Sequence, residues 1–361
     1  MSAGLPCCDL RSVLRGASIS DVTSRPVIVN VSESADPAWN WIGGRFPEDP
    51  FRWISFSGRP SSAFEKRIQT PKISRYRACW EAARAAKREQ AVLVVSHTPL
   101  VSVWTNVFCR AMGVKAPHLA FAFTFSKLPT GLRRRFIVDS LRGIDRFVCF
   151  SSVERGRYPE YFGIPEGKID SLRWSVGEPG FDSSATPIET TPYLCAVGGE
   201  GRDYTTLVEA MRRLPDHHLA IVTRPTNVKG LHLPSNVSVR TNIPLADVWN
   251  LVAHAKLMVL PLHDAQVPCG HTTLITAMQL ETPSIVTESV AMTDYISDET
   301  TGLTCPPGDP DVMARTIERL WDDEALASRL TRNARAFVTE ECSERRTVTD
   351  FMDYVRSLGL L

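Results

Sequence analysis

The sequence contains no long uninterrupted apolar run. Nowhere in its 361 residues is there anything close to the roughly 20 consecutive apolar residues that a membrane-spanning helix needs. Residues 1–24 also lack the apolar stretch of a signal peptide, because Arg11 and Arg15 interrupt them. We therefore expect a cytoplasmic protein that can touch a membrane only peripherally, at its inner face.

The chain has no excess of charge of either sign. Lys and Arg total 41 and Asp and Glu total 40, so the strongly basic surface of a dedicated nucleic-acid-binding protein is missing. Hydrophobic residues make up 43% and charged residues 22%, a balance typical of a folded globular protein and not of a disordered chain. We expect no nucleic-acid partner.

The nine cysteines form no pattern that binds zinc. Two of them, Cys7 and Cys8, are adjacent, none are paired at two-residue spacing, and an odd number fits poorly with a closed set of disulfides. Cys149, Cys195 and Cys305 stand in apolar stretches, where buried thiols are more common than catalytic ones. These features predict a reducing compartment, and no residue is predicted to bind a metal.

Short apolar runs alternate with helical patterns along most of the chain. This alternation predicts parallel sheets covered by helices on both faces. Strands are expected at residues 26–31, 51–56, 91–95, 118–123 and 146–150, and again at 193–197, 219–223, 237–240, 257–260 and 284–286. The fold class is therefore α/β, with two Rossmann-like, doubly wound lobes and a cleft between them.

The domain boundaries follow from where this alternation stops. A stretch rich in Gly, Pro, Ser and Thr predicts a linker at residues 177–191. Residues 25–176 are then the N-terminal lobe and residues 192–341 the C-terminal lobe. Residues 1–24 are expected to be poorly structured or accessory. Residues 342–361 are expected to form a helix that packs back on the N-terminal lobe.

A glycine-rich turn joins a strand to a helix in the second lobe, with the sequence Val-Gly-Gly-Glu-Gly-Arg-Asp-Tyr at residues 197–204. Gly198 and Gly199 would let the backbone come close to a ligand, and the helix start offers free N–H groups to a phosphate. Arg202 adds a charged hydrogen-bond donor. The alternative is an ordinary turn in which Asp203 caps the helix.

A second helix start follows the apolar strand at residues 257–260. Gly270, His271, Thr272 and Thr273 combine a flexible backbone with hydroxyl groups, which again suits an anion. The alternative is that Thr272 is only a cap and Thr273 only a packing residue. Two such helix starts in one lobe predict a site for a diphosphate.

Two further residues stand at the carboxyl ends of predicted strands. Arg224 follows the strand at 219–223 and is a candidate for a second cation that contacts phosphate. The alternative, equally compatible with its position, is that Arg224 is a solvated arginine in a loop. His97 follows the strand at 91–95 and could hydrogen-bond a hydroxyl of a ligand or assist proton transfer. A structural role for His97 is equally compatible with its position.

Three consecutive arginines, Arg133, Arg134 and Arg135, lie on a predicted helix of the first lobe. A solvated helix face is the favoured interpretation. The functional interpretation is that these arginines are attracted to an anionic membrane surface or to a lipid-linked acceptor.

The second lobe resembles a known family. The segments that carry the resemblance are Gly270–Met278, Glu281–Thr287, Asp294–Ile296, Thr301–Leu303 and Pro306–Pro310. Together they are similar to the donor half of glycosyltransferase family 4, the group 1 enzymes of the GT-B fold. The similarity spans roughly residues 193–321 and is most specific at residues 302–310.

The resemblance implies a glycosyltransferase that moves a sugar from a nucleotide-diphosphate sugar to a glycan, a lipid-linked sugar or a small molecule. Transfer would retain the anomeric configuration, require no metal and no cofactor beyond the co-substrate, and serve polysaccharide biosynthesis. The N-terminal lobe would bind the acceptor. Catalytic candidates are His97, Arg202 and Arg224. Donor-binding candidates are Gly198, Gly199, Arg202, Arg224, Gly270, His271, Thr272, Thr273 and Thr276.

One departure from the family pattern concerns the ribose. Members commonly carry two glutamates separated by seven residues, and the matching positions are Pro268 and Thr276. The second glutamate ordinarily holds the ribose hydroxyls, whereas Thr276 offers one short hydroxyl. The alternatives are therefore a weak or inactive relative that still binds nucleotide sugars, or a nucleotide-sugar epimerase or hydrolase of the same fold. An epimerase would need several carboxylates at the sugar, and no such set is evident.

Overall fold

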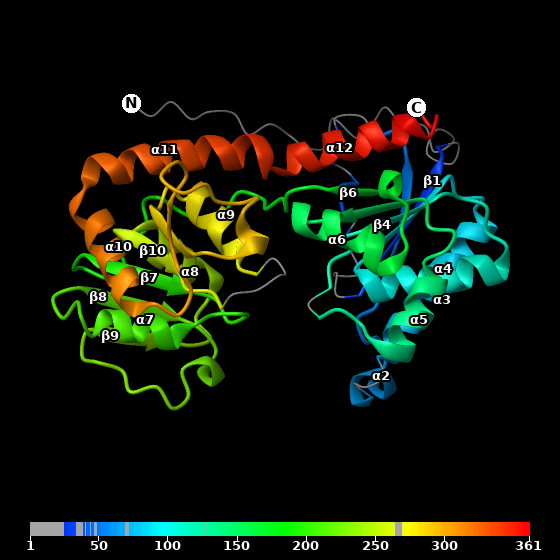
Figure 1. The fold of residues 1–361 in the computed structure, drawn as a ribbon. Coiled ribbons are helices and arrows are strands. Elements are labelled where there is room, and N and C mark those ends of the chain that lie inside the picture. Colours follow the sequence, from blue (N-terminus) through cyan, green and yellow to red (C-terminus); the bar gives the residue numbers. More distant parts are fainter. Residues whose placement is uncertain are drawn as a thin grey trace, which may run out of the picture. The chain divides into compact units, whose positions relative to one another are not determined.

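The computed structural model describes residues 25–33, 39, 41–43, 45–46, 49–68, 72–125, 127–263 and 269–361. The predicted N-terminal segment, residues 1–24, and Pro268 lie outside the described residues. The chain divides into two compact units (Figure 1). Unit 1 comprises Met1–Phe123 and Thr130–Phe147, and unit 2 comprises Thr124–Pro129 and Val148–Leu361.

The first sheet has the strand order β2-β1-β3-β4-β5-β6. The register is parallel at each of the pairs β1–β2, β1–β3, β3–β4 and β4–β5. Every residue of β1 and β3 is buried, as expected for strands covered on both faces. The strands are β1 (Val27–Ser32), β2 (Arg52–Ser57), β3 (Leu93–His97), β4 (His118–Phe121), β5 (Arg146–Cys149) and β6 (Ile169–Ser171).

The helices of this part of the chain are α2 (Ala63–Arg67), α3 (Ile73–Arg88), α4 (Pro99–Met112), α5 (Gly131–Ser140) and α6 (Ser152–Phe162), with a 3₁₀ turn η1 at Glu166–Lys168. The buried face of α3 is rich in alanine, including Ala78, Ala82 and Ala86. Small side chains let its backbone pack closely against α4 and β1.

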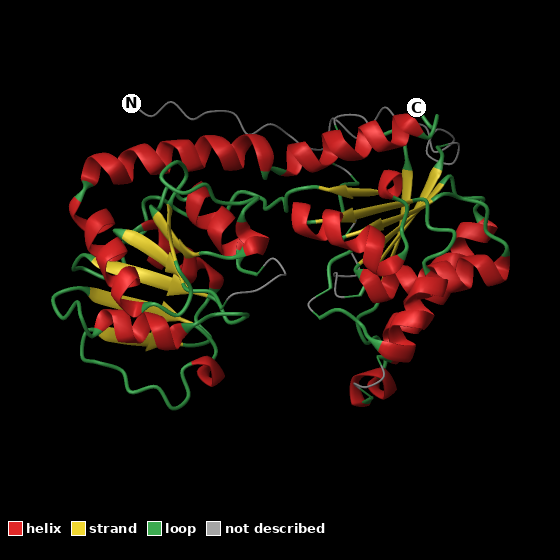
Figure 2. Ribbon diagram, viewed as in Figure 1, coloured by secondary structure: helices red, strands yellow, loops and turns green. Residues whose placement is uncertain are grey.

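The second sheet has the order β12-β11-β10-β7-β8-β9 (Figure 2). Side chains of β7 alternate between two separate cores: Tyr193, Cys195 and Val197 enter one, and Leu194 and Ala196 enter the other. Both faces are therefore covered. The strands are β7 (Tyr193–Val197), β8 (His218–Val222), β9 (Val237–Arg240), β10 (Leu257–Leu260), β11 (Ser284–Thr287) and β12 (Leu303–Cys305).

The helices of the second part are α7 (Tyr204–Met211), α8 (Leu245–Ala253), α9 (His271–Gln279), α10 (Pro310–Asp322), α11 (Glu324–Glu341) and α12 (Glu344–Ser357), with 3₁₀ turns η2 (Pro225–Asn227) and η3 (Val290–Met292). Residues 177–191 form neither helix nor strand. On α12, the Thr347 hydroxyl donates a hydrogen bond to Ser175. The boundaries predicted for the domains stay a prediction.

Each sheet has a switch point in its strand order. In the second sheet the chain runs outward from β7 to β8 and β9, then returns to place β10 on the other side of β7. In the first sheet β2 and β3 likewise lie on opposite sides of β1. Ligands of open α/β sheets bind outside the carboxyl ends of the strands at such points.

The predicted fold class is confirmed in its main feature: the chain forms two doubly wound α/β sheets. All of the predicted strands are present, each within about two residues of its expected ends. The sequence missed β6 and β12, because three residues are too few to show a period, and α6, because Gly156 and Pro159 interrupt its pattern. No helix in the described part of the chain has the length and apolar character needed to cross a bilayer.

Candidate functional site

The candidate site lies at the switch point of the second sheet, where the loops after β7 and β10 meet. The backbone of His263 donates a hydrogen bond to Gly201 (3.1 Å), and that of Asp203 donates one to Pro261 (3.0 Å). These bonds form a short antiparallel bridge between Arg202 and Leu262. The glycine-rich turn is therefore fixed against the chain that leads to α9.

Arg202 connects this turn to the start of α9, although the two are far apart in sequence. Its side chain is buried (9% exposed). Nε donates to the Val197 carbonyl (3.1 Å), Nη1 to the Glu200 carbonyl (2.8 Å) and Nη2 to Thr273 Oγ1 (3.2 Å). Nη1 also lies 3.9 Å from Cys269 Sγ. Burial lowers the pKa of Arg202.

Two glycines make room for this buried guanidinium. Gly198 (φ 115°) and Gly270 (φ 88°) both adopt left-handed backbone conformations that favour glycine. A Cβ atom on Gly198 would lie 2.5 Å from Arg202 Nη2, and one on Gly270 would lie 2.8 Å from Nη1. The sequence suggested that these glycines admit a ligand, whereas in the structure they admit Arg202.

The contacts of Arg202 limit what it can offer a ligand directly. An arginine side chain carries five N–H groups, and the four contacts above use four of them. Arg202 thus acts mainly as a buried positive charge that holds two loops together, with one N–H left for a further acceptor.

Free backbone donors surround this charge. Among the described residues, the N–H groups of Gly199, Glu200 and Gly201 have no acceptor. The first backbone bond of α9 runs from Leu274 to the Gly270 carbonyl, and no side chain caps the helix, so the N–H groups at 271–273 are also free within the described chain. A helix start of this kind attracts an anion.

The start of α7, in contrast, is capped by a side chain. Asp203 accepts a hydrogen bond from the Thr206 backbone (3.1 Å) and another from the Thr206 hydroxyl (2.6 Å). Its carboxylate caps one backbone N–H of this helix start and offsets part of its positive potential. Of the two predicted anion-binding helix starts, that of α7 has a side-chain cap and that of α9 has none.

The carbonyl groups of the glycine-rich turn are directed back into the protein. Gly198 O accepts from the hydroxyls of Tyr204 (2.6 Å) and Thr223 (2.8 Å), and Gly199 O accepts from Asn227 Nδ2 (2.6 Å). With their oxygens held this way, the peptides after Gly198 present N–H groups and not oxygens to a ligand. Sequence reasoning did not identify Tyr204, Thr223 and Asn227.

Arg224 lies beside this turn and pairs with Glu200 at 2.6 Å. Both side chains are mostly exposed, 66% and 75% respectively. An exposed pair of this kind is weak, so an anion can compete with Glu200 for Arg224.

His271 begins α9 and packs between two aromatic rings. Its ring centroid lies 5.2 Å from that of Trp174 and 5.5 Å from that of Tyr295. Burial, together with the nearby charge of Arg202, lowers the pKa of His271 to about 4. The imidazole is therefore neutral at pH 7. Thr272 beside it is exposed.

Thr276 faces the interior of unit 2 one turn further along α9. It is 1% exposed, and its hydroxyl has no hydrogen-bond partner among the described residues. A buried hydroxyl without a partner costs stability. Among the donor-site candidates in the described chain, His271 shares this feature, because its Nδ1 is also buried without a hydrogen-bond partner.

His97 lies at the switch point of the first sheet, at the end of β3. Its Nε2 donates to Asn30 Oδ1 (2.8 Å), and its ring centroid lies about 5 Å from those of Trp39 and Trp41. Burial lowers the pKa of His97 to about 3. So weak a base accepts a proton poorly, and the surroundings favour hydrogen bonding over proton transfer.

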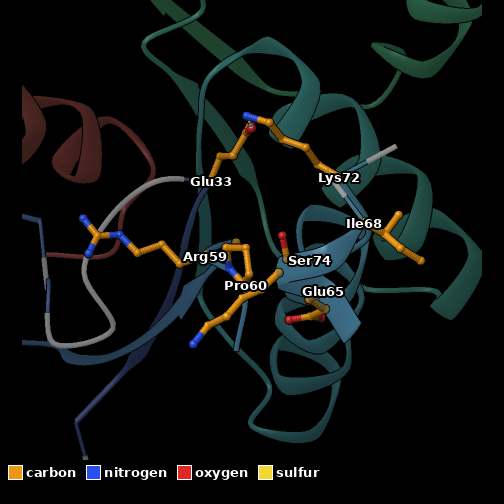
Figure 3. A pocket seen from close by; sticks show the side chains of 9 residues that line it. Glu33, Arg59, Pro60, Glu65, Ile68, Lys72 and Ser74 are labelled. Atoms are coloured by element: carbon orange, nitrogen blue, oxygen red, sulfur yellow. Dashed lines mark hydrogen bonds and ion pairs between the residues drawn. The ribbon is translucent and has the colours of Figure 1, made fainter. Parts of the chain in front are cut away.

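A pocket of about 610 Å³ opens at the carboxyl ends of β1 and β2 in unit 1 (Figure 3). Glu33 on its wall pairs with Lys72 (2.7 Å), and buried Glu65 pairs with Arg77 (2.8 Å). The Arg77 guanidinium lowers the pKa of Glu65 to about 2, so this carboxylate stays ionised. No sequence pattern indicated this pocket, because its residues come from separate elements.

Comparison with known proteins agrees with this architecture. The structure resembles a glycosyltransferase from Rickettsia africae, with a TM-score of 0.72 and 14% identity over 93% of this chain and 99% of that one. It also resembles sucrose-phosphate synthase from Thermosynechococcus elongatus, with a TM-score of 0.68 and 18% identity over 93% of this chain and 100% of that one. A third similar structure is Anabaena HepE in complex with UDP, with a TM-score of 0.67 and 14% identity over 92% of this chain and 100% of that one. The fold is that of the GT-B glycosyltransferases.

The sequence of the second lobe identifies the class further. Residues 197–337 match the family model of glycosyl transferases group 1. No curated protein sequence matches the chain. The match covers most of the second lobe and supports the predicted enzyme class, a glycosyltransferase. Membership of family 4 in particular is compatible with this result and stays a prediction.

The unpartnered hydroxyl of Thr276 leads to a first prediction. Thr276→Val removes the hydroxyl at nearly constant volume, so the free energy of unfolding should stay equal or rise by about 1 kcal/mol. If the hydroxyl holds the ribose, affinity for nucleoside diphosphates falls about 2- to 10-fold, the range for one neutral hydrogen bond. Chemical denaturation and calorimetric titration measure the two effects.

The matched control is Thr282→Val. The Thr282 hydroxyl is also buried but donates to the Val252 carbonyl (2.9 Å), so its loss should destabilise the protein by about 1 kcal/mol and leave nucleotide affinity unchanged. Unchanged affinity in Thr276→Val would show that the ribose lies elsewhere.

Proposed function

We propose that this glycosyltransferase takes its sugar from a nucleotide-diphosphate sugar bound in unit 2. The diphosphate lies between the N–H groups of Gly199–Gly201 and the first turn of α9. The observation that carries the proposal is the convergence of free backbone donors from two loops around the buried charge of Arg202. Such an arrangement suits a phosphate, because these N–H groups have no other acceptor among the described residues.

During transfer, this site must stabilise the leaving group. As the acceptor oxygen bonds to the anomeric carbon, the bond from that carbon to the diphosphate oxygen breaks. Negative charge grows on the leaving diphosphate until it takes up the proton of the acceptor hydroxyl. Preorganised N–H groups and a fixed cation stabilise such charge without rearranging. Arg224 can add a second cation once it leaves Glu200.

We further propose that transfer retains the anomeric configuration and proceeds without a metal ion. The backbone amides, Arg202 and Arg224 together supply the positive potential that a metal would otherwise supply. The described residues contain no group of three His, Cys, Asp or Glu side chains placed to hold an ion. Asp264, beside His263, lies outside the described residues.

UDP is the first nucleotide to try, because structures of Anabaena HepE hold UDP and UDP-glucose. For the acceptor, we propose the pocket of unit 1 at the ends of β1 and β2. Its size suits a sugar-sized molecule, and its wall carries both charged and hydroxyl groups. His97 does not line this pocket but stands at the end of the neighbouring strand β3. Neutral at pH 7, it would act as a hydrogen-bonding group of unit 1.

A weakly active or inactive nucleotide-sugar-binding protein is the second candidate. The observation in its favour is Thr276, which replaces the carboxylate expected from family resemblance by a single buried hydroxyl. Binding of UDP-glucose without release of UDP on any of a broad panel of acceptors would favour this candidate. Transfer to any acceptor would eliminate an inactive protein, and fast turnover would also eliminate a weakly active one.

The second prediction concerns metal ions. Binding of UDP and release of UDP from UDP-glucose should be unchanged when a chelator is added, because the amides and arginines carry the charge stabilisation. A metal-dependent glycosyltransferase assayed in parallel shows that the chelator works. Loss of turnover that magnesium or manganese restores would contradict metal independence.

The third prediction concerns the exposed pair of Glu200 and Arg224. Glu200→Gln should tighten UDP binding about 2- to 5-fold, because it frees Arg224 and removes a negative charge near the diphosphate; this range corresponds to an exposed ion pair. Arg224→Gln should weaken binding by a similar factor. Calorimetric titration at low ionic strength measures both.

The control for this pair is Glu299→Gln. Glu299 and Arg319 form another exposed ion pair in unit 2, so the change removes the same charge away from the proposed site. Its UDP affinity should equal that of the wild type. Weaker UDP binding by Glu200→Gln would mean that Glu200 is itself a contact of the nucleotide and not a competitor.

A further inference from the structure

Helix α5 exposes two large apolar side chains on one face. Leu132 is 80% exposed and Phe136 is 45% exposed. They are separated by four residues, so they lie one above the other on the helix surface. Leaving them in water is unfavourable, and an exposed apolar pair at this spacing suits a contact surface.

Basic side chains flank this apolar pair. The helical spacing places Arg133 on one side of Leu132 and Phe136 and Arg135 on the other, and both arginines are exposed. Neither has an ion pair or hydrogen bond within the described residues. The single acidic residue of α5 is Asp139, near its end, which pairs with Arg142 (3.3 Å).

Some other exposed arginines are paired. Arg346 and Arg356, for example, each pair with a carboxylate on α12. The net charge of the chain is only +1, so the positive charge of α5 is a local feature and not part of a generally basic surface.

The opposite side of α5 is firmly held. Ile137 and Ser140 are buried, and Asn106 of α4 donates to the Ser140 carbonyl (2.7 Å). The ring of Phe136 lies 5.4 Å from that of Trp104. The helix therefore presents Leu132 and its arginines on a fixed support.

We propose that α5 docks the protein on the surface of an anionic lipid bilayer. Leu132 and Phe136 enter the interfacial region while Arg133 and Arg135 contact lipid phosphates, as amphipathic basic helices do. Nucleic acid would also attract the arginines, but it offers no apolar layer for Leu132. Since no helix in the described part of the chain spans a bilayer, this contact is peripheral.

The test is co-sedimentation of the full chain with vesicles. The protein should bind vesicles that contain phosphatidylglycerol, should not bind phosphatidylcholine alone, and should dissociate as salt is raised. The double variant Arg133→Gln/Arg135→Gln should weaken vesicle binding about 25-fold at low salt, because each lost charge weakens binding about fivefold. Leu132→Ser should also weaken it, and the 80% exposure of Leu132 means that this variant keeps its fold.

Two controls match these variants. Arg315→Gln with Arg345→Gln removes the same charge from exposed positions on α10 and α12, and Leu245→Ser removes a leucine that is 63% exposed at the start of α8. Both should bind vesicles like the wild type. Three results would each overturn the proposal: equal loss in the arginine controls, unchanged binding by Leu132→Ser, or binding to duplex nucleic acid in place of vesicles.

Discussion

The site depends on one buried charge. Placing a guanidinium in the interior is costly unless its N–H groups find acceptors, and Arg202 meets this condition with acceptors from both the β7 loop and α9. That solution in turn requires glycine at positions 198 and 270, where any side chain would meet the guanidinium. The geometry of both loops follows from accommodating Arg202.

This constraint also explains the electrostatics of the site. The Asp203 carboxylate caps α7 and offsets its positive end, whereas the start of α9, next to Arg202, has no side-chain cap. The same arginine helps to keep His271 neutral. A neutral imidazole at the helix start leaves the charge of the site to the backbone dipoles and the arginines, which remain constant across the physiological pH range.

The sequence predicted those parts of the fold that depend on local pattern. Apolar runs located β7 and β10, and the motif around residues 302–310 indicated the family. The role of Arg202 was not predictable, because its contact with Thr273 joins residues 71 positions apart. The burial of His97 depends likewise on Trp39 and Trp41, which no local pattern connects to it. Asp203 was weighed as a cap, but only the structure shows that it caps one of the two helix starts expected to bind an anion.

A crystal structure of the protein with its best-binding nucleoside diphosphate tests the central claim most directly. The account predicts diphosphate oxygens within about 3.2 Å of amide nitrogens from both Gly199–Gly201 and the first turn of α9, the distance of an N–H···O hydrogen bond. The Arg202 contacts to Val197 and Thr273 should persist in the complex. A nucleotide bound with its diphosphate out of reach of both sets of amides would contradict the account.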